Sequence, residues 1–336
     1  MLSIAFISDS GYVLPSVVAI TSLLMNKKDS TEYKIYFMAI GLSEDEKKQI
    51  SNICKKYNTE ILIIDVNQNE LRNRYSGIGE HECCANISAL IKFDLPTYCP
   101  EDKLLYLDGD LIVQKDISEL EGVNFDEKTF VAAVPESGLL YNKNIIIQGV
   151  RDYFNSGVML LNLKGFREND ISRKLYLEKI NSNDNSLMDQ HVFNKVFAES
   201  KVRLDHSFNV LYTSIVRAHF FHGISIDQIN DLYGKKYSGF EQIKENAKII
   251  HYSTFDKPWK FSDIEAVELW DYYFENSVFK GNPLKRKRIH NKFLNGLRKR
   301  KAFGLLGTFI WETETKGIKK AVLDVKKYII RAGKGE

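Results

Sequence analysis

The stretch Leu104–Val113, LLYLDGDLIV, decides the fold and indicates the chemistry of this chain. In it, Asp108 and Asp110 flank Gly109 between two apolar runs, and such runs are typical of buried strands in a parallel sheet. Ligands of open α/β sheets gather at the carboxyl ends of these strands. Two acids there are costly without a cation, and carboxylate oxygens suit Mg²⁺ and Mn²⁺. The stretch therefore predicts a metal-binding turn in which Gly109 permits close backbone approach, with a plain polar turn as the alternative.

The rest of the chain alternates between strand and helix patterns. Ser43 and Glu46 form a predicted capping box, and residues 209–246 are poorly periodic, as in loops with short helices that recognise substrates. The βαβαβ rhythm of the first part predicts an α/β, Rossmann-like sheet. Strands are expected at residues 2–8, 33–40, 60–66, 103–107, 129–134, 157–162 and 247–252, and helices at 13–24, 43–57, 86–95, 166–179, 189–197 and 264–274.

Composition indicates an ordinary globular protein. The chain has 336 residues, of which 44% are hydrophobic and 27% charged. No apolar run approaches the ~20 residues that span a bilayer, and the first residues read as a strand, so we expect a location in the cytoplasm or on the inner face of the plasma membrane. The four cysteines are too irregular for a disulfide framework, and Cys83 and Cys84 beside His81 fit no common zinc spacing.

Charge divides the chain into an acidic body and a basic tail. Residues 280–336 hold 17 Lys and Arg against 4 Asp and Glu, whereas residues 1–279 hold 30 against 40. We therefore predict a catalytic domain at 1–279 and a basic, amphipathic helical tail at 280–336. The tail mixes cations with apolar residues, which suits an anionic membrane surface. A basic helix packed on the body is the alternative, and the acidic body disfavours nucleic acid as a partner.

A second informative segment is His251–Trp259, HYSTFDKPW, which follows an apolar strand. His251 by itself would be read as a core histidine. Beside two carboxylates at another strand end it becomes a candidate metal ligand. Lys257 can neutralise a phosphate as a point charge. Together these residue types favour a metal that holds a diphosphate.

Four segments in this order, LLYLDGDLIV, YFNSGVMLLNL (153–163), LMDQHVFNKVF (187–197) and HYSTFDKPW, resemble glycosyltransferase family 8. The resemblance covers residues 2–275. The family comprises retaining nucleotide-sugar transferases, including bacterial lipopolysaccharide glucosyl- and galactosyltransferases and glycogenin. It implies a GT-A fold with a mixed Rossmann-like sheet flanked by helices. It also implies UDP-glucose or UDP-galactose as donor, a glycan, glycolipid or glycoprotein acceptor, and Mn²⁺, with Mg²⁺ as the alternative ion.

The resemblance also assigns roles to single residues. Asp108, Asp110 and His251 would ligate the metal, and Lys257 would contact a phosphate. Donor contacts would come from Ile7, Asp9, Tyr12, Lys92, Gly109, Asn155 and Ser156, with Asp9 on the uracil and Asn155 and Ser156 against the sugar. Asp189 and Gln190 would lie near the anomeric carbon, so the catalytic set would be Gln190, Asp189 and Lys257.

Departures from the family pattern shape the expected mechanism. Lys92 stands where many relatives have arginine, and Gly11 where many have asparagine. His191 stands where many relatives have an aspartate that has been proposed as a nucleophile, which weakens a double-displacement scheme and favours attack from the leaving-group face. Glu136 stands where relatives carry an acidic residue near the sugar. A nucleotide-sugar pyrophosphorylase is disfavoured, because SDSGY (8–12) lacks a Gly-rich phosphate loop. A non-catalytic sugar-nucleotide or glycan-binding protein is the other alternative.

Overall fold

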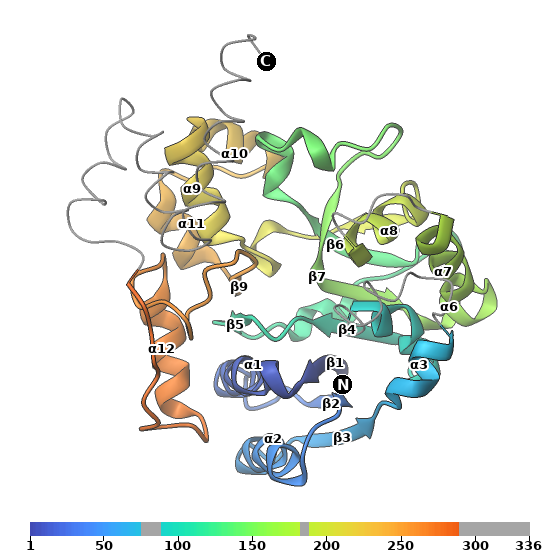
Figure 1. The fold of residues 1–336 in the computed structure, drawn as a ribbon. Helices are drawn as coiled ribbons and strands as arrows, with labels where there is room; N and C mark the ends of the chain where they lie inside the picture. The colour runs from blue at the N-terminus through green and yellow to red at the C-terminus, as the bar shows by residue number, and fades with distance from the viewer. Residues whose placement is uncertain (75–88, 182–187, 289–336) are drawn as a thin grey trace, which may run out of the picture.

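A seven-stranded mixed sheet forms the centre of the protein (Figure 1). The computed structural model describes residues 1–74, 89–181 and 188–288. Strand order is β3-β2-β1-β4-β7-β6-β8; β1, β2, β3 and β4 run parallel, whereas β7 pairs antiparallel with both β4 and β6. The predicted α/β class with a mixed sheet is confirmed. The strands are β1 (Leu2–Asp9), β2 (Tyr33–Ile40), β3 (Glu60–Asp65), β4 (Lys103–Leu107), β6 (Val131–Pro135), β7 (Phe154–Asn162) and β8 (Lys201–Arg203).

Helices cover both faces of this sheet because successive strand residues point to opposite sides. Along β1, Ile4 and Phe6 enter one apolar core, while Ala5 and Ile7 enter the other. The first core is closed by α1 (Val13–Met25), α2 (Glu44–Lys56) and α12 (Val267–Asn276). The second core is closed by α6 (Leu163–Glu168), α7 (Ile171–Asn181) and α8 (Met188–Val196). The strands are therefore held between two layers of helices.

Local signals explain where several helices begin and end. The predicted capping box is confirmed: the Ser43 hydroxyl accepts from Glu46 N, and the Glu46 carboxylate accepts from Ser43 N. The prediction of a single helix at 166–179 is wrong. The segment forms two helices, α6 and α7, which are separated at Asp170, whose φ is +50°. Such an angle is outside the helical region.

The aperiodic segment 209–246 forms short helices, as predicted. They are α9 (Tyr212–His222), α10 (Ile226–Tyr233) and α11 (Phe240–Asn246). Other short elements among the described residues are α3 (Gln68–Arg74), α5 (Leu95–Tyr98), η1 (Ser10–Tyr12), η2 (Lys92–Asp94), η3 (Ser118–Gly122), η4 (Ser137–Leu140), η5 (Lys143–Ile145) and η6 (His206–Phe208).

A separate two-stranded sheet positions the site. β5 (Leu111–Val113) pairs antiparallel with β9 (Ile249–His251), and Leu111 is the partner of His251. The strand that follows the acidic turn thus lies beside the strand that carries the histidine, although about 140 residues separate them. This pairing brings the two motifs of the sequence into one place.

The start of the basic tail packs on the body. Arg286 forms an ion pair with Asp271, and its guanidinium lies 5.2 Å from the ring centroid of Trp270. Residues 289–336, which include most of the predicted membrane-associating tail, lie outside the described residues, as do His81, Cys83 and Cys84. Within the described ranges, no helix has both the length and the apolar character that crossing a membrane requires.

Candidate active site

The acidic turn is a tight link between β4 and β5. Asp108 N donates to the Gly157 carbonyl at 2.8 Å, and Tyr252 N donates to the Asp110 carbonyl at 2.9 Å. A Cβ at Gly109 would lie 2.4 Å from the Ser16 hydroxyl, so the glycine lets the turn pack against α1 without displacing that side chain. These main-chain contacts therefore fix the backbone positions of Asp108 and Asp110, from which the two carboxylates extend.

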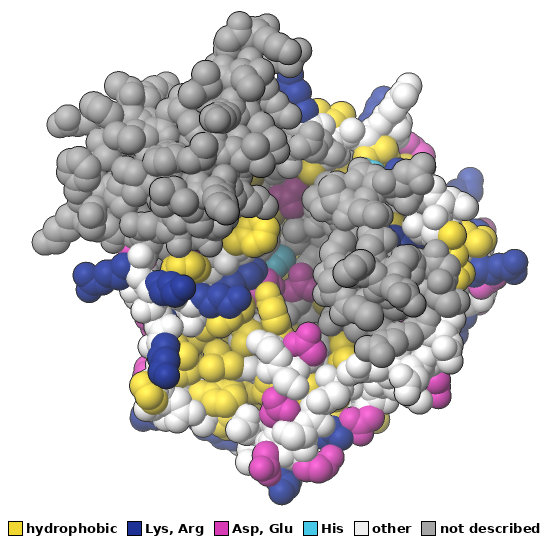
Figure 2. Space-filling model, viewed as in Figure 1, with side chains coloured by type: hydrophobic (Ala, Val, Ile, Leu, Met, Phe, Trp, Pro, Cys, Tyr) yellow, Lys and Arg dark blue, Asp and Glu magenta, His cyan; other side chains and the backbone are white. Residues whose placement is uncertain are grey.

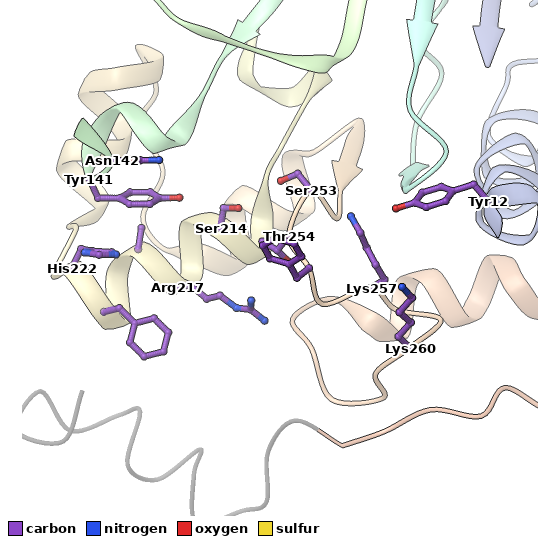
Figure 3. Close-up of a pocket in the computed structure, with 13 residues that line it drawn as sticks. Tyr12, Tyr141, Asn142, Ser214, Arg217, His222, Ser253, Thr254, Lys257 and Lys260 are labelled. Atoms are coloured by element: carbon purple, nitrogen blue, oxygen red, sulfur yellow. The ribbon is translucent and has the colours of Figure 1, made fainter. Parts of the chain in front are cut away.

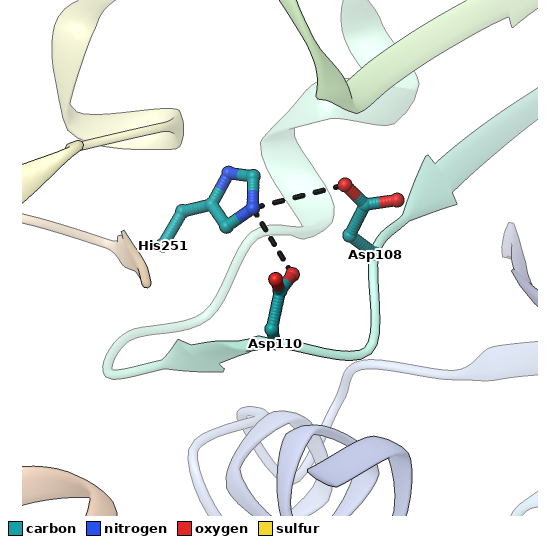
Figure 4. Close-up of side chains that lie close together, drawn as sticks. All are labelled: Asp108, Asp110 and His251. Atoms are coloured by element: carbon teal, nitrogen blue, oxygen red, sulfur yellow. Dashed lines mark hydrogen bonds and ion pairs between the residues drawn. The ribbon is translucent and has the colours of Figure 1, made fainter. Parts of the chain in front are cut away.

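The side chains of Asp108 and Asp110 both face the ring of His251 (Figure 4). The candidate ligand atoms of the three residues all lie within 4.8 Å of one another. His251 Nε2 is 3.1 Å from Asp110 Oδ1 and 3.7 Å from Asp108 Oδ2. The three predicted ligands are thus brought together, as the sequence indicated. In the space-filling view, acidic side chains and a histidine lie at the bottom of a hollow near the middle of the face (Figure 2).

This cluster fits a divalent metal ion. Two carboxylates and one imidazole are the donor types that Mn²⁺ accepts, and His251 is only 2% exposed. A Cβ at Gly157 would lie 2.2 Å from His251 Cε1 and 2.6 Å from Asp108 Oδ2, so the backbone of β7 is packed directly against two of the ligands. These three side chains are the residues that could hold the ion.

Two buried lysines neutralise the carboxylates. Lys257 Nζ lies 2.5 Å from Asp110 Oδ2 and donates to the Tyr252 carbonyl at 2.7 Å. Lys92 Nζ lies 3.2 Å from Asp108 Oδ1 and 2.8 Å from Asp189 Oδ2. The structure therefore places both predicted lysines beside the acidic cluster, and it brings Asp189 into the same charge network.

The charge network shifts the pKa of Lys92 and the pKa of Asp110. Burial alone would lower the pKa of Lys92, but Asp108 and Asp189 outweigh it and raise that pKa above its ordinary value. Burial would raise the pKa of Asp110, but Lys257 and His251 hold it well below its ordinary value. Two cations and three carboxylates thus share a buried site, and a divalent cation together with a diphosphate would alter that balance by little.

The predicted sugar-side residues form a second cluster next to the metal ligands. Gln190 Oε1 accepts from Ser156 N at 3.1 Å and from Asn155 Nδ2 at 3.0 Å. Asn155 Nδ2 also donates to Glu136 Oε2 at 2.9 Å, and the Ser156 hydroxyl donates to Asp189 Oδ2 at 3.0 Å. Ser156 N and Asn155 Nδ2 both hold Gln190 through its amide oxygen, which leaves its amide nitrogen to donate to a ligand.

Other predicted residues lie nearby in different settings. Asp9 caps η1 by accepting from Gly11 N at 2.9 Å. The ring of Tyr12 packs edge-on against Trp259, with centroids 5.6 Å apart. The side chain of Ile7 belongs to the second apolar core, so a ligand would meet chiefly its backbone. His191 is buried with its ring centroid 6.2 Å from that of Tyr153.

A cavity of about 650 Å³ adjoins the metal cluster (Figure 3). Tyr12 and Lys257 stand at one side of it, whereas Tyr141 and His222, whose rings stack at 4.9 Å, stand at the other. The further lining residues are Asn142, Ser214, Arg217, Ala218, Phe221, Ser253, Thr254, Phe255 and Lys260. The cavity is large enough for a sugar next to the ligand that Lys257 would hold.

Sequence reasoning missed two residues of the site. Tyr106 donates to Asp108 Oδ1 at 2.5 Å, and burial together with Asp108 raises its pKa well above the ordinary value. Its position near the end of β4, two residues before Asp108, was a usable signal, because alternate residues of an extended segment share a face. Asn209 contacts both Asn155 and His251, but it stands in the aperiodic segment, where no local pattern marks it.

Residues 3–263 match the family model described as Glycosyl transferase family 8. The chain is 25% identical over 300 residues to General stress protein A of Bacillus subtilis (strain 168), covering 86% of this chain and 98% of that protein. It is 25% identical over 290 residues to Lipopolysaccharide 1,2-glucosyltransferase of Escherichia coli (strain K12), covering 83% and 79% respectively.

Solved structures are similar in fold. One is galactosyltransferase LgtC in complex with donor and acceptor sugar analogues, with a TM-score of 0.65, 21% identity, and coverage of 82% of this chain and 96% of that chain. Another is the bifunctional glycosyltransferase WbbM, with a TM-score of 0.65, 18% identity, and coverage of 83% and 50%.

Proposed function

Because the chain belongs to glycosyl transferase family 8, we propose that it transfers glucose or galactose from a UDP-sugar to a glycan in a metal-dependent, retaining reaction. The chain is a glycosyltransferase, and its predicted GT-A fold is confirmed by the likeness to LgtC. The observation that carries the proposal is the Asp108–Asp110–His251 cluster with Lys257 on one of its carboxylates. The relatives named lipopolysaccharide 1,2-glucosyltransferase support a cell-surface glycan, glycolipid or glycoprotein as acceptor.

The residues of the cluster suit departure of UDP. Mn²⁺ or Mg²⁺, held by Asp108, Asp110 and His251, would offset the negative charge that develops on the diphosphate. Lys257 lies against Asp110, so its ammonium stands where a phosphate bound at the cluster would be within reach. Lys92 keeps its charge while buried, and it lies on the side of Asp189 and the sugar-binding amides. Both lysines would stabilise the negative charge that develops on the departing diphosphate more strongly than they stabilise the intact donor.

The surroundings of Gln190 support attack from the leaving-group face. An amide is a weak nucleophile, and Asn155 and Ser156 hold Gln190 through its oxygen, which leaves its nitrogen to donate to the sugar. The neighbouring carboxylates already have partners: Asp189 bonds to Lys92 and Ser156, and Glu136 accepts from Asn155. In this scheme Gln190 and Asp189 shape the site, and the departing phosphate takes the acceptor proton.

The cavity beside Lys257 is the proposed acceptor site. Its far wall carries the stacked pair Tyr141 and His222, and flat rings bind the faces of sugar rings. Ser214 and Asn142 add hydrogen-bonding groups to the same wall. An acceptor hydroxyl bound there would approach the donor from the cavity, on the side of the metal cluster where Lys257 and Tyr12 lie.

Release of UDP tests the proposal. Wild type is incubated with UDP-glucose and with UDP-galactose, with Mn²⁺ and with EDTA. We expect hydrolysis of one donor in Mn²⁺, its loss in EDTA, and its loss in Asp110→Asn. The matched control Asp126→Asn changes an exposed aspartate between η3 and β6 and should keep wild-type release. Undiminished release without metal would contradict metal dependence, and UDP-sugar binding without release under all conditions would favour a non-catalytic binding protein.

We also propose that residues 280–336 attach the enzyme to an anionic membrane, on the inner face of the plasma membrane. The support is the excess of 17 basic over 4 acidic residues in this segment. Because Arg286 packs on α12, the informative truncation removes residues 289–336 only. The full chain should sediment with phosphatidylglycerol vesicles and the truncated chain should stay in solution. Equal sedimentation of both would refute this role of the tail.

A further inference from the structure

Asn209 joins the metal-ligand cluster to the sugar-side amides. Its Oδ1 lies 3.1 Å from His251 Nδ1, and its Nδ2 donates to Asn155 Oδ1 at 3.0 Å. Asn155 in turn holds Gln190 Oε1 and Glu136 Oε2. A chain of hydrogen bonds therefore runs from a candidate metal ligand to the residues expected around the anomeric carbon.

One backbone N–H determines which group donates and which accepts in each of these hydrogen bonds. Gly157 N donates to Asn155 Oδ1 at 3.0 Å, and a backbone N–H can only donate. Asn155 must therefore present its oxygen to Gly157 and to Asn209. Asn209 must then turn its nitrogen toward Asn155 and its oxygen toward His251. As a result Nδ1 of His251 carries a proton, and Nε2, which faces Asp108 and Asp110, is the nitrogen that would bind a metal ion.

The residues of this hydrogen-bond chain are buried, and backbone hydrogen bonds hold them in place. Asn209 is 1% exposed, His251 2% and Asn155 7%, so water does not compete for these bonds. Val210 N donates to the Ile249 carbonyl at 2.9 Å, and His251 N donates to the Val210 carbonyl at 3.0 Å. The backbone that carries Asn209 is thereby tied to β9, and the two side chains keep one relative position.

We propose that Asn209 is a positioning residue that holds His251 in its metal-binding tautomer and couples the metal site to the sugar-binding amides. This inference rests on the proposed function, because it assumes that the cluster binds a divalent metal and that Gln190 faces the donor sugar. Partners of this kind orient metal-bound histidines, and their loss typically weakens metal binding by about 10- to 100-fold.

Two substitutions at the same position separate the two halves of the role. Asn209→Ala removes both hydrogen bonds. Asn209→Asp keeps an oxygen for His251 Nδ1 but cannot donate to Asn155. Rotation of the Asn155 amide cannot rescue that bond, because its nitrogen would then meet Gly157 N. The alanine variant should therefore fail on both sides, and the aspartate variant on the sugar side only.

The first measurement is the affinity for Mn²⁺ alone, by isothermal titration calorimetry. We expect Asn209→Ala to bind Mn²⁺ about 10- to 100-fold more weakly than wild type. Asn209→Asp should bind at least as tightly as wild type. The matched control is Asn230→Ala, which also removes two hydrogen bonds, those to Tyr237 N and the Tyr237 carbonyl. It should keep wild-type affinity although its thermal stability falls.

The second measurement is donor hydrolysis at saturating Mn²⁺. Both Asn209 variants should lose about tenfold or more in kcat/KM for the UDP-sugar, because Asn155 has lost a buried partner. Wild-type Mn²⁺ affinity in Asn209→Ala, or equal weakening in both variants, would overturn the tautomer role. Wild-type kcat/KM in Asn209→Asp would overturn the coupling. A wild-type protein that binds Mn²⁺ but hydrolyses no donor would overturn the proposed function, and the Mn²⁺ affinities would still decide the tautomer role.

Discussion

Replacing Gly157 with alanine should disable the metal site while leaving the fold in place. The added Cβ would lie 2.2 Å from His251 Cε1, 2.9 Å from His251 Nδ1 and 2.6 Å from Asp108 Oδ2. Ordinary contacts begin near 3.4 Å, so the imidazole must retreat by roughly 1 Å. Metal–ligand distances tolerate about 0.2 Å, so His251 would be lost as a ligand. We expect Mn²⁺ affinity to fall at least about 100-fold.

The assay compares Gly157→Ala with Gly122→Ala, because nothing lies within 4 Å of a Cβ built at Gly122. Mn²⁺ binding is followed by the electron paramagnetic resonance signal of the free ion, and circular dichroism shows whether each variant is folded. Overpacking at position 157 should cost about 1–3 kcal/mol of stability, which a protein of this size tolerates. A folded Gly157→Ala protein with wild-type Mn²⁺ affinity would refute the packing of β7 on the ligands.

Further predictions concern charge and pH. Lys92→Met leaves the buried Asp189 and the partly buried Asp108 without their cation. The free energy of unfolding in urea should therefore fall by about 3–5 kcal/mol in EDTA and by less in Mn²⁺, and an equal loss in both would contradict the shared charge network. Asp108→Ala should abolish UDP release at every Mn²⁺ concentration tested, and release that recovers at high Mn²⁺ would argue against a direct ligand. Burial lowers the pKa of His206 to about 3, so the unfolded chain binds one more proton between that pH and about 6.5, and wild-type stability should fall on acidification. In His206→Phe that fall, measured by urea unfolding at several pH values, should be shallower by up to about 1.4 kcal/mol per pH unit, and an unchanged slope would show that His206 is accessible to protons.

The sequence predicted the acidic turn because its signals are local. Leu104–Leu107 are apolar, Asp108 and Asp110 follow at once, and β4 ends where the run ends. The capping box at Ser43 and the strand before His251 are local signals of the same kind. Such features depend on neighbouring residues, so they can be recognised without the fold.

Long-range pairing could not be predicted in this way. No pattern near Leu111 indicates that it pairs with His251 in a separate small sheet, since the partner is distant in the chain. The role of Asn209 could not be predicted for the same reason, because it depends on hydrogen bonds to Asn155 and His251, which lie on other elements. The break at Asp170 was missed because an aspartate in the left-handed region leaves no mark on the apolar periodicity of the two helices around it.

The central claim is that Asp108, Asp110 and His251 hold the metal that carries the diphosphate of the donor. Diffraction from crystals grown with Mn²⁺ and UDP, recorded at the manganese absorption edge, tests it most directly. We expect an anomalous peak at bonding distance from the two carboxylates and from His251 Nε2, with the diphosphate on the same ion and Lys257 beside it. A manganese peak elsewhere, or UDP bound with no ion among these three side chains, would contradict the claim.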